Sequence, residues 1–545
     1  MYSNYYNDYK LKKIYDVAAE LGFSSEDILP HGHYIAKIPM HYLHDRLANN
    51  PDGHLILVTA MTPTPQGEGK TTTTIGLGDA LRQLGKKSII CLREPSLGPY
   101  FGIKGGGTGA GKSQVMPAED INLHFVGDMY SVSKANNLLA AIIDNHLQHG
   151  NELGIDQRRI TWRRVIDLND RALRHIVIGL GGVSHGLPRE DGFNITPASE
   201  IMAILCMSEN YVDLGERLSK IIIGYTYKGE PVTAEQLQVV GAMQILLRDA
   251  VHPNLVQTIE GTPAFVHAGP FANIAQGTNS VISTKMALKL ADYVVTEAGF
   301  ATDLGAEKFF HIKCRMTGLN PDAVVIVATI KALKYHGWTT KNGGFANLDK
   351  HIENIRLFGI EPIIAINKFD DDSEEDLSFV VNYYDKKGVK AFVCNHYKEG
   401  GSGAINLAQA IIDYIENNPL KKINYLYKLE MNIEEKIETI ARLIYGASGI
   451  EITKKAYTEI ELIEKSGYKN LPICIAKTAK SLSDNEKLLG RPENFKITVN
   501  DVYLSAGAGF IVVICGNIVT MPGLPKVPAA VKIKVLPDGR AIGLS

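Results

Sequence analysis

Apolar residues along the chain fall into short continuous runs, and segments with helical spacing lie between many of these runs. The apolar runs cover residues 54–61, 88–93, 176–178, 293–296, 323–328 and 362–366. Helix-like segments cover residues 70–84, 280–291 and 347–358. Continuous apolar strands that alternate with helices are typical of a parallel sheet that is covered on both faces. The pattern therefore predicts an α/β fold.

Three later segments add detail to this prediction. Residues 510–521 are apolar but interrupted by Gly516 and Asn517, and they are shorter than the about 20 residues that span a bilayer, so we expect one or two buried strands. Residues 421–480 are rich in Lys and Glu at helical spacing, which predicts exposed helices of a peripheral lobe. The acidic run at residues 370–376 predicts a solvated loop that leads into a helix N-terminus.

The composition of the 545 residues, with 45% hydrophobic and 21% charged, is typical of a globular protein of two to four domains. A net charge of −2 gives no overall field that would favour nucleic acid or a membrane as a partner. The six cysteines form no C-x-x-C pair, which argues against a zinc ribbon, an iron–sulfur cluster or a disulfide scaffold. The first ten residues have no apolar core, so no signal peptide is expected and the predicted location is the cytoplasm.

Two segments are candidates for a phosphate-binding loop. Residues 106–113 (Gly-Gly-Thr-Gly-Ala-Gly-Lys-Ser) fit the pattern G-x-x-x-x-G-K-[ST], whereas residues 64–71 depart from it because Thr64 replaces the first glycine. Such a loop works by joining a buried strand to a helix whose N-terminal amides point at the phosphates. Only residues 64–71 lie between a predicted strand and a predicted helix. We therefore interpret residues 64–71 as the nucleotide loop.

Each part of this loop has an expected role. The predicted ATP-binding residues are Thr64, Pro65, Gln66, Gly67, Glu68, Gly69, Lys70 and Thr71. Gly67 and Gly69 let backbone amides approach the phosphates, Lys70 can reach the outer phosphates, and the Thr71 hydroxyl can bind Mg²⁺. The alternative is a glycine-rich turn between a strand and a helix, with no ligand.

Arg93 follows the second predicted strand, at the kind of strand end where ligands of open α/β sheets bind. Its planar guanidinium could hold a carboxylate or a transferring phosphoryl group. The alternative is a surface arginine paired with Glu94. The glycine-rich residues 102–112 allow three interpretations: a second anion loop, a lid, or a flexible surface loop.

Other candidates follow later strands. Residues 367–370 spell N-K-x-D, a weak signal for guanine recognition, and Phe369 within them could instead stack on a planar ligand. His267 lies in a loop rich in Gly and Pro, where a structural role is the main interpretation and acid–base chemistry the minor one. Glu297 or Asp303 could hold Mg²⁺ through water, or Asp303 could cap a helix.

Taken together, these segments resemble formate–tetrahydrofolate ligases. The similar stretches are residues 64–71, 93–99, 119–125 with Gly127 and Asp128, 265–274, 303–309 and 521–526. The resemblance implies a P-loop NTPase-like, mostly parallel sheet covered by helices, with additional smaller α/β lobes. It also implies a discontinuous nucleotide domain (1–115 plus 290–365), an inserted α/β domain (116–289) and a C-terminal domain (366–545) that contributes to the folate site.

The activity implied by the resemblance is the ATP-dependent joining of formate to tetrahydrofolate, which gives 10-formyltetrahydrofolate, ADP and phosphate through formyl phosphate. Lys70, Mg²⁺ and Arg93 would offset negative charge while two anions meet, with Arg93 at the formyl phosphate. Phe369 and Tyr397 would sandwich the pterin, with Tyr397 where relatives have tryptophan. Lys112 stands where relatives usually carry an aromatic residue. Family members are typically homotetramers that are activated by K⁺ or NH₄⁺.

Two other classes of function remain open at this stage. The first is a nucleotide-gated switch protein of the P-loop superfamily, which the N-K-x-D element at residues 367–370 would support. The second is another ATP-dependent enzyme that activates carboxylates, such as a dethiobiotin synthetase-like ligase, which would keep the phosphate loop but not the two aromatic stackers. Nucleotide preference and formate-dependent turnover separate these classes from the ligase.

Overall fold

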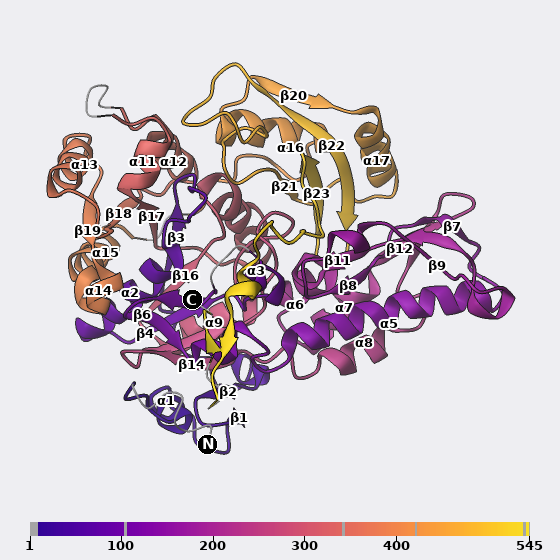
Figure 1. The fold of residues 1–545 in the computed structure, drawn as a ribbon, viewed down its shortest axis with the longest axis horizontal. Coiled ribbons are helices and arrows are strands. Elements are labelled where there is room, and N and C mark those ends of the chain that lie inside the picture. Colours follow the sequence, from indigo (N-terminus) through magenta and orange to yellow (C-terminus); the bar gives the residue numbers. More distant parts are fainter. Residues whose placement is uncertain (1–8, 103–105, 340–343, 420–421, 538–540, 544–545) are drawn as a thin grey trace.

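The computed structural model of the protein describes residues 9–102, 106–339, 344–419, 422–537 and 541–543. Residues 1–8 lie outside the described residues, and they include most of the N-terminal stretch in which no signal peptide is expected. At the centre is a mixed sheet of 12 strands with helices on both faces, and two smaller lobes flank it (Figure 1). The α/β fold with a mostly parallel sheet and smaller lobes is therefore confirmed. Among the described residues, no helix is both long enough and apolar enough to cross a membrane.

The main path of the central sheet runs β1-β2-β14-β15-β4-β16-β3-β17-β18-β19. These strands are β1 Leu29–His31, β2 Ile35–Lys37, β14 Asn254–Thr258, β15 Pro263–Val266, β4 Ser88–Leu92, β16 Tyr293–Glu297, β3 His54–Ala60, β17 Ala323–Ala328, β18 Ile363–Asn367 and β19 Ala391–Cys394. All neighbours from β15 to β19 are parallel, and the pairs from β1 to β15 are antiparallel. A short hairpin of β5 (Gly109–Ala110) and β6 (Ser113–Met116) adds to β14.

Both faces of the central strands are apolar, which explains why their sequences read as continuous hydrophobic runs. In β3, Ile56 and Val58 pack under α2 (Lys70–Gln83) and α15 (Ile405–Asn417). The alternate residues Leu55 and Leu57 pack in the opposite cluster, which includes α9 (Val281–Leu290) and α12 (Ala346–Leu357). Side chains of successive residues point to opposite faces of a strand, so each run serves two layers of helices.

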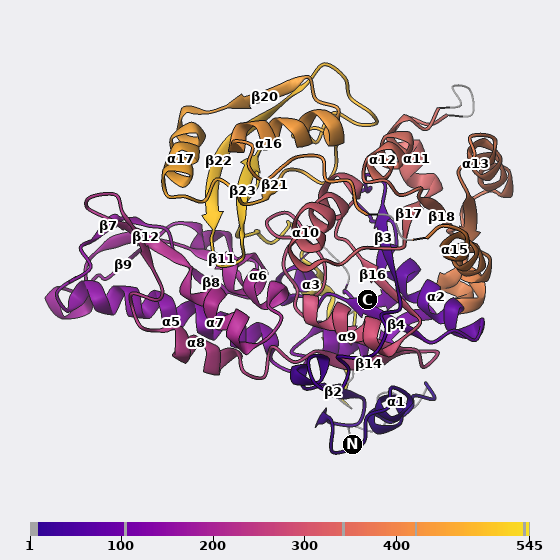
Figure 2. The same ribbon diagram turned by 180° about the vertical axis from the view of Figure 1, so that it is seen from behind.

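One flanking lobe consists of residues inserted between β6 and β14 (Figure 2). Its helices are α5 Asp128–Gln148, α6 Glu200–Met207, α7 Tyr211–Ser219 and α8 Val240–Leu247. Its strands are β7 Ile155–Ile160, β8 Arg164–Ile166, β9 Ile176–Ile178, β10 Arg189–Asp191, β11 Phe193–Ile195, β12 Ile222–Thr226 and β13 Pro231–Thr233.

The second lobe comes from the C-terminal part of the chain. Its four-stranded sheet has the order β20-β22-β23-β21, and the strands are β20 Gly449–Ile452, β22 Lys496–Ser505, β23 Phe510–Cys515 and β21 Ile473–Ala476. The helices α16 (Ile433–Ile440) and α17 (Lys454–Lys465) belong to it. The expectation of exposed helices over residues 421–480 was therefore incomplete, because β20 and β21 also lie there and the apolar faces of both helices are buried.

Element boundaries agree closely with the sequence pattern near the expected site. α2 begins at Lys70 and ends at Gln83, and β4 ends at Leu92, so Arg93 is the first residue beyond the strand. The acidic run leads into α13 (Glu374–Lys386), whose N-cap Ser373 accepts a hydrogen bond from the Asp376 amide. Within residues 510–521 a single strand forms, β23 (Phe510–Cys515), and the chain turns after it at Gly516.

Asp79 on α2 generates a prediction about stability and pH. Its carboxyl group is buried, and burial raises its pKa to about 7 although the Thr258 hydroxyl donates a hydrogen bond to it at 2.6 Å. Between about pH 4 and pH 7 the folded protein keeps a proton that the unfolded chain has lost, so stability falls as the pH rises through this window. Asp79→Asn should remove this slope and raise the free energy of unfolding at pH 8 by about 2–4 kcal/mol.

Urea unfolding measured at intervals from pH 4 to pH 8 checks this expectation. Asp413→Asn is the matched control, because Asp413 is exposed on α15 and its loss should leave the slope unchanged. An unaltered slope in Asp79→Asn would show that this carboxyl group does not carry the proton.

Candidate functional site

The candidate residues gather at one edge of the central sheet. Because the strands from β4 to β19 are parallel, their carboxyl ends meet there, and ligands of open α/β sheets bind at such edges. Arg93 follows β4, Glu297 ends β16, Phe369 follows β18 and Tyr397 follows β19, while the loop at residues 61–69 follows β3. The structure thus brings residues separated by some three hundred positions to one place.

The loop at residues 64–69 is held closed by side chains from neighbouring strand ends. The Glu68 carboxylate accepts hydrogen bonds from the Thr64 amide at 2.6 Å and from the Thr329 hydroxyl at the end of β17. The Asn367 side chain at the end of β18 donates to the Glu68 carbonyl at 3.1 Å. A Cβ atom on Gly69, which has φ +69°, would lie 2.3 Å from the Asn367 amide nitrogen, so this position requires glycine.

The first turn of α2 presents a lysine and a threonine to the same space. The Thr71 hydroxyl donates to the Glu297 carboxylate at 2.9 Å. Lys70 is partly exposed, and in the described part of the chain its ammonium makes neither a hydrogen bond nor an ion pair. Burial lowers the pKa of Lys70, with Glu297 raising it and Arg93 lowering it, so these three charges lie close together. A cation without a partner beside a strand-end carboxylate is suited to receive a bound anion.

Metal ligation at this point would involve the hydroxyl of Thr71 and the carboxylate of Glu297. These are oxygen donors, which Mg²⁺ prefers, and Mg²⁺ usually keeps several waters and takes only a few protein ligands. No group of three or more His, Cys, Asp or Glu side chains that could hold a metal occurs within the described ranges. The donor set therefore fits a Mg²⁺ ion that is shared with a phosphate ligand.

Arg93, the first residue after β4, also lies close enough to Glu297 for their charges to interact. One guanidinium nitrogen, Nη1, donates to the Pro270 carbonyl at 3.1 Å, and Nε is buried without a partner. Burial lowers the pKa of Arg93 and the Glu297 charge raises it. The expected alternative, a surface pair with Glu94, is not observed among the described residues, since the Glu94 side chain is buried away from any ion pair.

Phe369 and Tyr397 come from adjacent strand ends. The Lys368 amide donates to the Cys394 carbonyl at 3.0 Å, and Lys398 forms an ion pair with Asp370 at 2.5 Å, so the residues next to each ring are in contact. Tyr397 is 51% exposed, and Phe369 is half-buried with the Lys331 ammonium 4.8 Å from its ring centroid. Both rings therefore remain accessible to a planar ligand.

The second glycine-rich candidate, residues 106–113, is a hairpin and not a phosphate loop. It forms β5, a turn with Gly111 at φ +62°, and the start of β6, and no helix follows directly. The Lys112 amide donates to the Tyr397 carbonyl at 2.9 Å. Residues 103–105 of the same stretch lie outside the described residues. Of the two candidates, only residues 64–71 join a strand to a helix.

Two other sequence candidates, His267 and Asp303, have partners that indicate structural roles. Both ring nitrogens of His267 are hydrogen bonded, to the Ser280 hydroxyl at 2.6 Å and the Ala250 carbonyl at 2.7 Å, and burial lowers its pKa to about 4. The main interpretation of His267 as structural is therefore supported. Asp303 does not cap a helix, because its carboxylate forms a buried ion pair with Lys477 at 2.7 Å.

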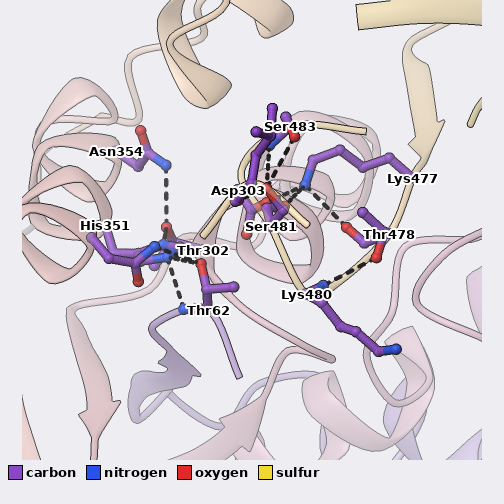
Figure 3. A network of polar contacts seen from close by, with 12 residues as sticks. Thr62, Thr302, Asp303, His351, Asn354, Lys477, Thr478, Lys480, Ser481 and Ser483 are labelled. Atoms are coloured by element: carbon purple, nitrogen blue, oxygen red, sulfur yellow. Dashed lines mark hydrogen bonds and ion pairs between the residues drawn. The ribbon is translucent and has the colours of Figure 1, made fainter. Parts of the chain in front are cut away.

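A buried polar network supports the base of the loop (Figure 3). His351 Nε2 accepts a hydrogen bond from the Thr62 amide at 2.9 Å, and Nδ1 lies 2.6 Å from the Thr302 hydroxyl. Because an amide can only donate, Nε2 carries no proton, so His351 is neutral and donates from Nδ1. Burial lowers its pKa to about 3, which keeps it neutral. The neighbouring Asp303–Lys477 pair links this network to the C-terminal lobe.

Several of these supporting residues were not found by sequence reasoning. His351 lies on α12 among apolar positions, which is typical of a core histidine, and Lys477 directly follows the strand β21. A histidine or lysine on an otherwise buried face is the only local signal, and it does not identify the partner. Thr329 has the stronger signal, because a threonine between a strand and a helix predicts an N-cap, which it forms for α11 (Ile330–Tyr335).

His351→Leu should weaken the base of the loop. The substitution leaves the buried Thr62 amide without an acceptor, so the free energy of unfolding should fall by about 1–3 kcal/mol. Urea unfolding measures the change, and His149→Leu is the control because His149 is exposed at the end of α5. A loss no larger than in the control would mean that the Thr62 amide finds another partner.

The comparison with protein families agrees with this geometry. A family model described as formate–tetrahydrofolate ligase matches residues 4–545, which is nearly the whole chain. The match covers the phosphate-loop candidate, the residues at the strand ends and both flanking lobes. The chain therefore belongs to the formate–tetrahydrofolate ligase family, and it is a ligase of one-carbon metabolism that joins formate to tetrahydrofolate.

Proposed function

We propose that the protein drives this ligation with ATP through a formyl phosphate intermediate. The observation that carries the proposal is the group of Lys70, Thr71, Glu297 and Arg93 at the carboxyl ends of β3, β4 and β16. Two cations face the same carboxylate there, and one of them begins the helix after a phosphate-type loop. This arrangement suits the transfer of a phosphoryl group between two anions.

The first step activates formate. A formate oxygen attacks the γ-phosphorus of ATP, the bond between this phosphorus and the β–γ bridging oxygen breaks, and ADP leaves. Lys70, from the N-terminus of α2, binds the outer phosphates, and the loop at residues 64–69 offers them the backbone amides of Gln66, Glu68 and Gly69. Arg93 binds the carboxylate and then the formyl phosphate through its planar donors.

In the second step the amine of tetrahydrofolate attacks the formyl carbon. The bond between this carbon and the phosphate oxygen breaks, phosphate leaves, and the amine loses its proton. Arg93 stabilises the negative charge that develops on the leaving phosphate. The free guanidinium donors of Arg93 support this role, because its Nε has no protein partner.

Thr71 and Glu297 would hold Mg²⁺, which neutralises phosphate charge when it is bound with ATP. The Thr71 hydroxyl is hydrogen bonded to the Glu297 carboxylate, so the protein holds both oxygen ligands next to each other before a metal ion binds. Phe369 and Tyr397 would stack on the two faces of the pterin, and their positions on adjacent strand ends support this. The homotetramer, the K⁺ or NH₄⁺ activator and the cytoplasmic location stay predictions.

A coupled assay of ADP release tests the proposed function. The wild-type protein should release ADP only when formate and tetrahydrofolate are both present, and ATP should be preferred to GTP. Lys70→Ala should lower kcat/KM at least about a thousandfold, because it removes charge stabilisation from the transferring group. Lys87→Ala is the control, since Lys87 is exposed at the opposite end of β4.

Three outcomes would contradict the proposal or part of it. Nucleotide hydrolysis with a preference for GTP and no need for formate would favour the switch protein. Turnover with a larger carboxylate in place of formate would favour another carboxylate-activating ligase. Near-normal turnover of Lys70→Ala would remove residues 64–71 from the mechanism.

Phe369→Ala should weaken the binding of tetrahydrofolate specifically. Loss of one stacking ring should raise the KM for tetrahydrofolate about tenfold and change the KM for ATP less than twofold. Phe379→Ala is the control, because Phe379 is also a partly exposed ring but lies on α13. An equal rise in the KM for both substrates would argue against stacking.

A further inference from the structure

Four lysines contact a candidate stacking ring, adjoin one in the chain or lie in the hairpin that packs against one, and three of them are neutralised by the protein itself. The three ion pairs are Lys331 with Asp371 at 3.2 Å, Lys368 with Glu374, and Lys398 with Asp370 at 2.5 Å. The fourth, Lys112, is exposed at the turn of the β5–β6 hairpin, and no described side chain forms an ion pair with it. Lys112 therefore differs from its neighbours in having a charge that remains available.

A carboxylate close to Lys112, that of Glu260, already has other partners. Glu260 Oε1 accepts a hydrogen bond from the Gly401 amide at 2.8 Å, and Oε2 accepts one from Gln83 at 2.8 Å. A Cβ atom on Gly400 would lie 1.8 Å from Glu260 Oε1 and 3.6 Å from the Lys112 Cβ atom, so Glu260 is close to the lysine stem. Because both of its oxygens are engaged, Glu260 holds the chain around Gly401 and leaves the ammonium unpaired.

The position of Lys112 beside Tyr397 is fixed by the backbone. The Lys112 amide donates to the Tyr397 carbonyl at 2.9 Å. At Gly111, a Cβ atom would lie 2.2 Å from that carbonyl oxygen and 2.8 Å from Cδ2 of the tyrosine ring. The hairpin therefore packs directly against Tyr397, and only glycine permits this approach. The Lys112 side chain therefore begins one residue after this contact.

We infer that Lys112 binds the carboxylates of the glutamate portion of tetrahydrofolate and so determines specificity for that end of the substrate. This inference rests on the proposed function, in which Tyr397 stacks on the pterin. Tetrahydrofolate has a flat pyrimidinone ring at its pterin end and carboxylates at its glutamate end, so a stacking ring and a cation within one molecule's length suit its two ends. A flexible lysine with a compact charge suits carboxylates that are partly solvated.

The test compares substrates that differ only in the anionic end. Tetrahydropteroate lacks the glutamate, tetrahydrofolate has one, and the triglutamate form has three. Lys112→Ala should raise the KM about threefold for tetrahydrofolate and about tenfold for the triglutamate, and leave that for tetrahydropteroate unchanged. Lys112→Arg should restore most of the loss. In the wild type the KM for the triglutamate should also rise more steeply with salt than in Lys112→Ala.

Lys134→Ala is the matched control. Lys134 is an exposed lysine 4.9 Å from a tyrosine ring, but it lies on α5 in the inserted lobe, far from α14 (His396–Glu399) (Figure 1). An equal rise of the KM for all three substrates in Lys112→Ala would overturn the inference and assign the lysine to hairpin packing, and so would unchanged values. Wild-type protein without formate-dependent ADP release would instead refute the proposed function.

Discussion

The site depends on the parallel pairing of β4, β16, β3, β17, β18 and β19. The hydrogen-bond register places Glu297 opposite Val58, two residues before β3 ends, so its carboxylate meets Thr71 in the first turn of α2. The same register places Asn367 opposite Cys394, so the segments that carry the two rings leave the sheet together. A shift of one residue in any of these pairs would turn the strand-end side chains to the other face. Register therefore fixes both the charged group and the aromatic group.

The loop at residues 64–71 departs from the standard phosphate-loop sequence pattern, and the structure explains how it keeps its conformation. Glu68 occupies a variable position of the pattern, and its carboxylate is turned inward to the Thr64 amide and the Thr329 hydroxyl. A buried carboxylate is costly unless it is hydrogen bonded, and both of its oxygens are. The Glu68 side chain thus holds the two ends of the loop together by hydrogen bonds. Gly67 at φ +83° and Gly69 provide the left-handed backbone that the turn needs. A first glycine is not needed when Thr64 is held in this way.

The sequence predicted the strands, the helix after the loop and the positions at the strand ends, because these follow from local hydrophobic patterns. Arg93, Phe369 and Tyr397 were located by their places after strands or by the family resemblance. The contacts of Asn367 with the loop and of His351 with Thr62 were not predicted, since they join residues almost three hundred positions apart. Local pattern shows that a polar residue is buried but not which group satisfies it. The same limit hid the Asp303–Lys477 pair, which joins the region of the central sheet to the C-terminal lobe.

The helix α2 also positions the candidate folate ring. His396, directly before Tyr397, is buried with Nε2 3.1 Å from the Thr73 hydroxyl on α2, and its carbonyl accepts from the Ser113 hydroxyl at 2.9 Å. A Cβ atom on Gly76 would lie 2.5 Å from the His396 Cβ atom, so the helix is in direct contact there. Lys70 and the support of Tyr397 therefore belong to consecutive turns of one helix. A displacement of α2 would move the ring with it, because close packing transmits small shifts. Under the proposed function, in which α2 binds the nucleotide and Tyr397 the folate, this contact would give a physical route by which one substrate affects the affinity for the other.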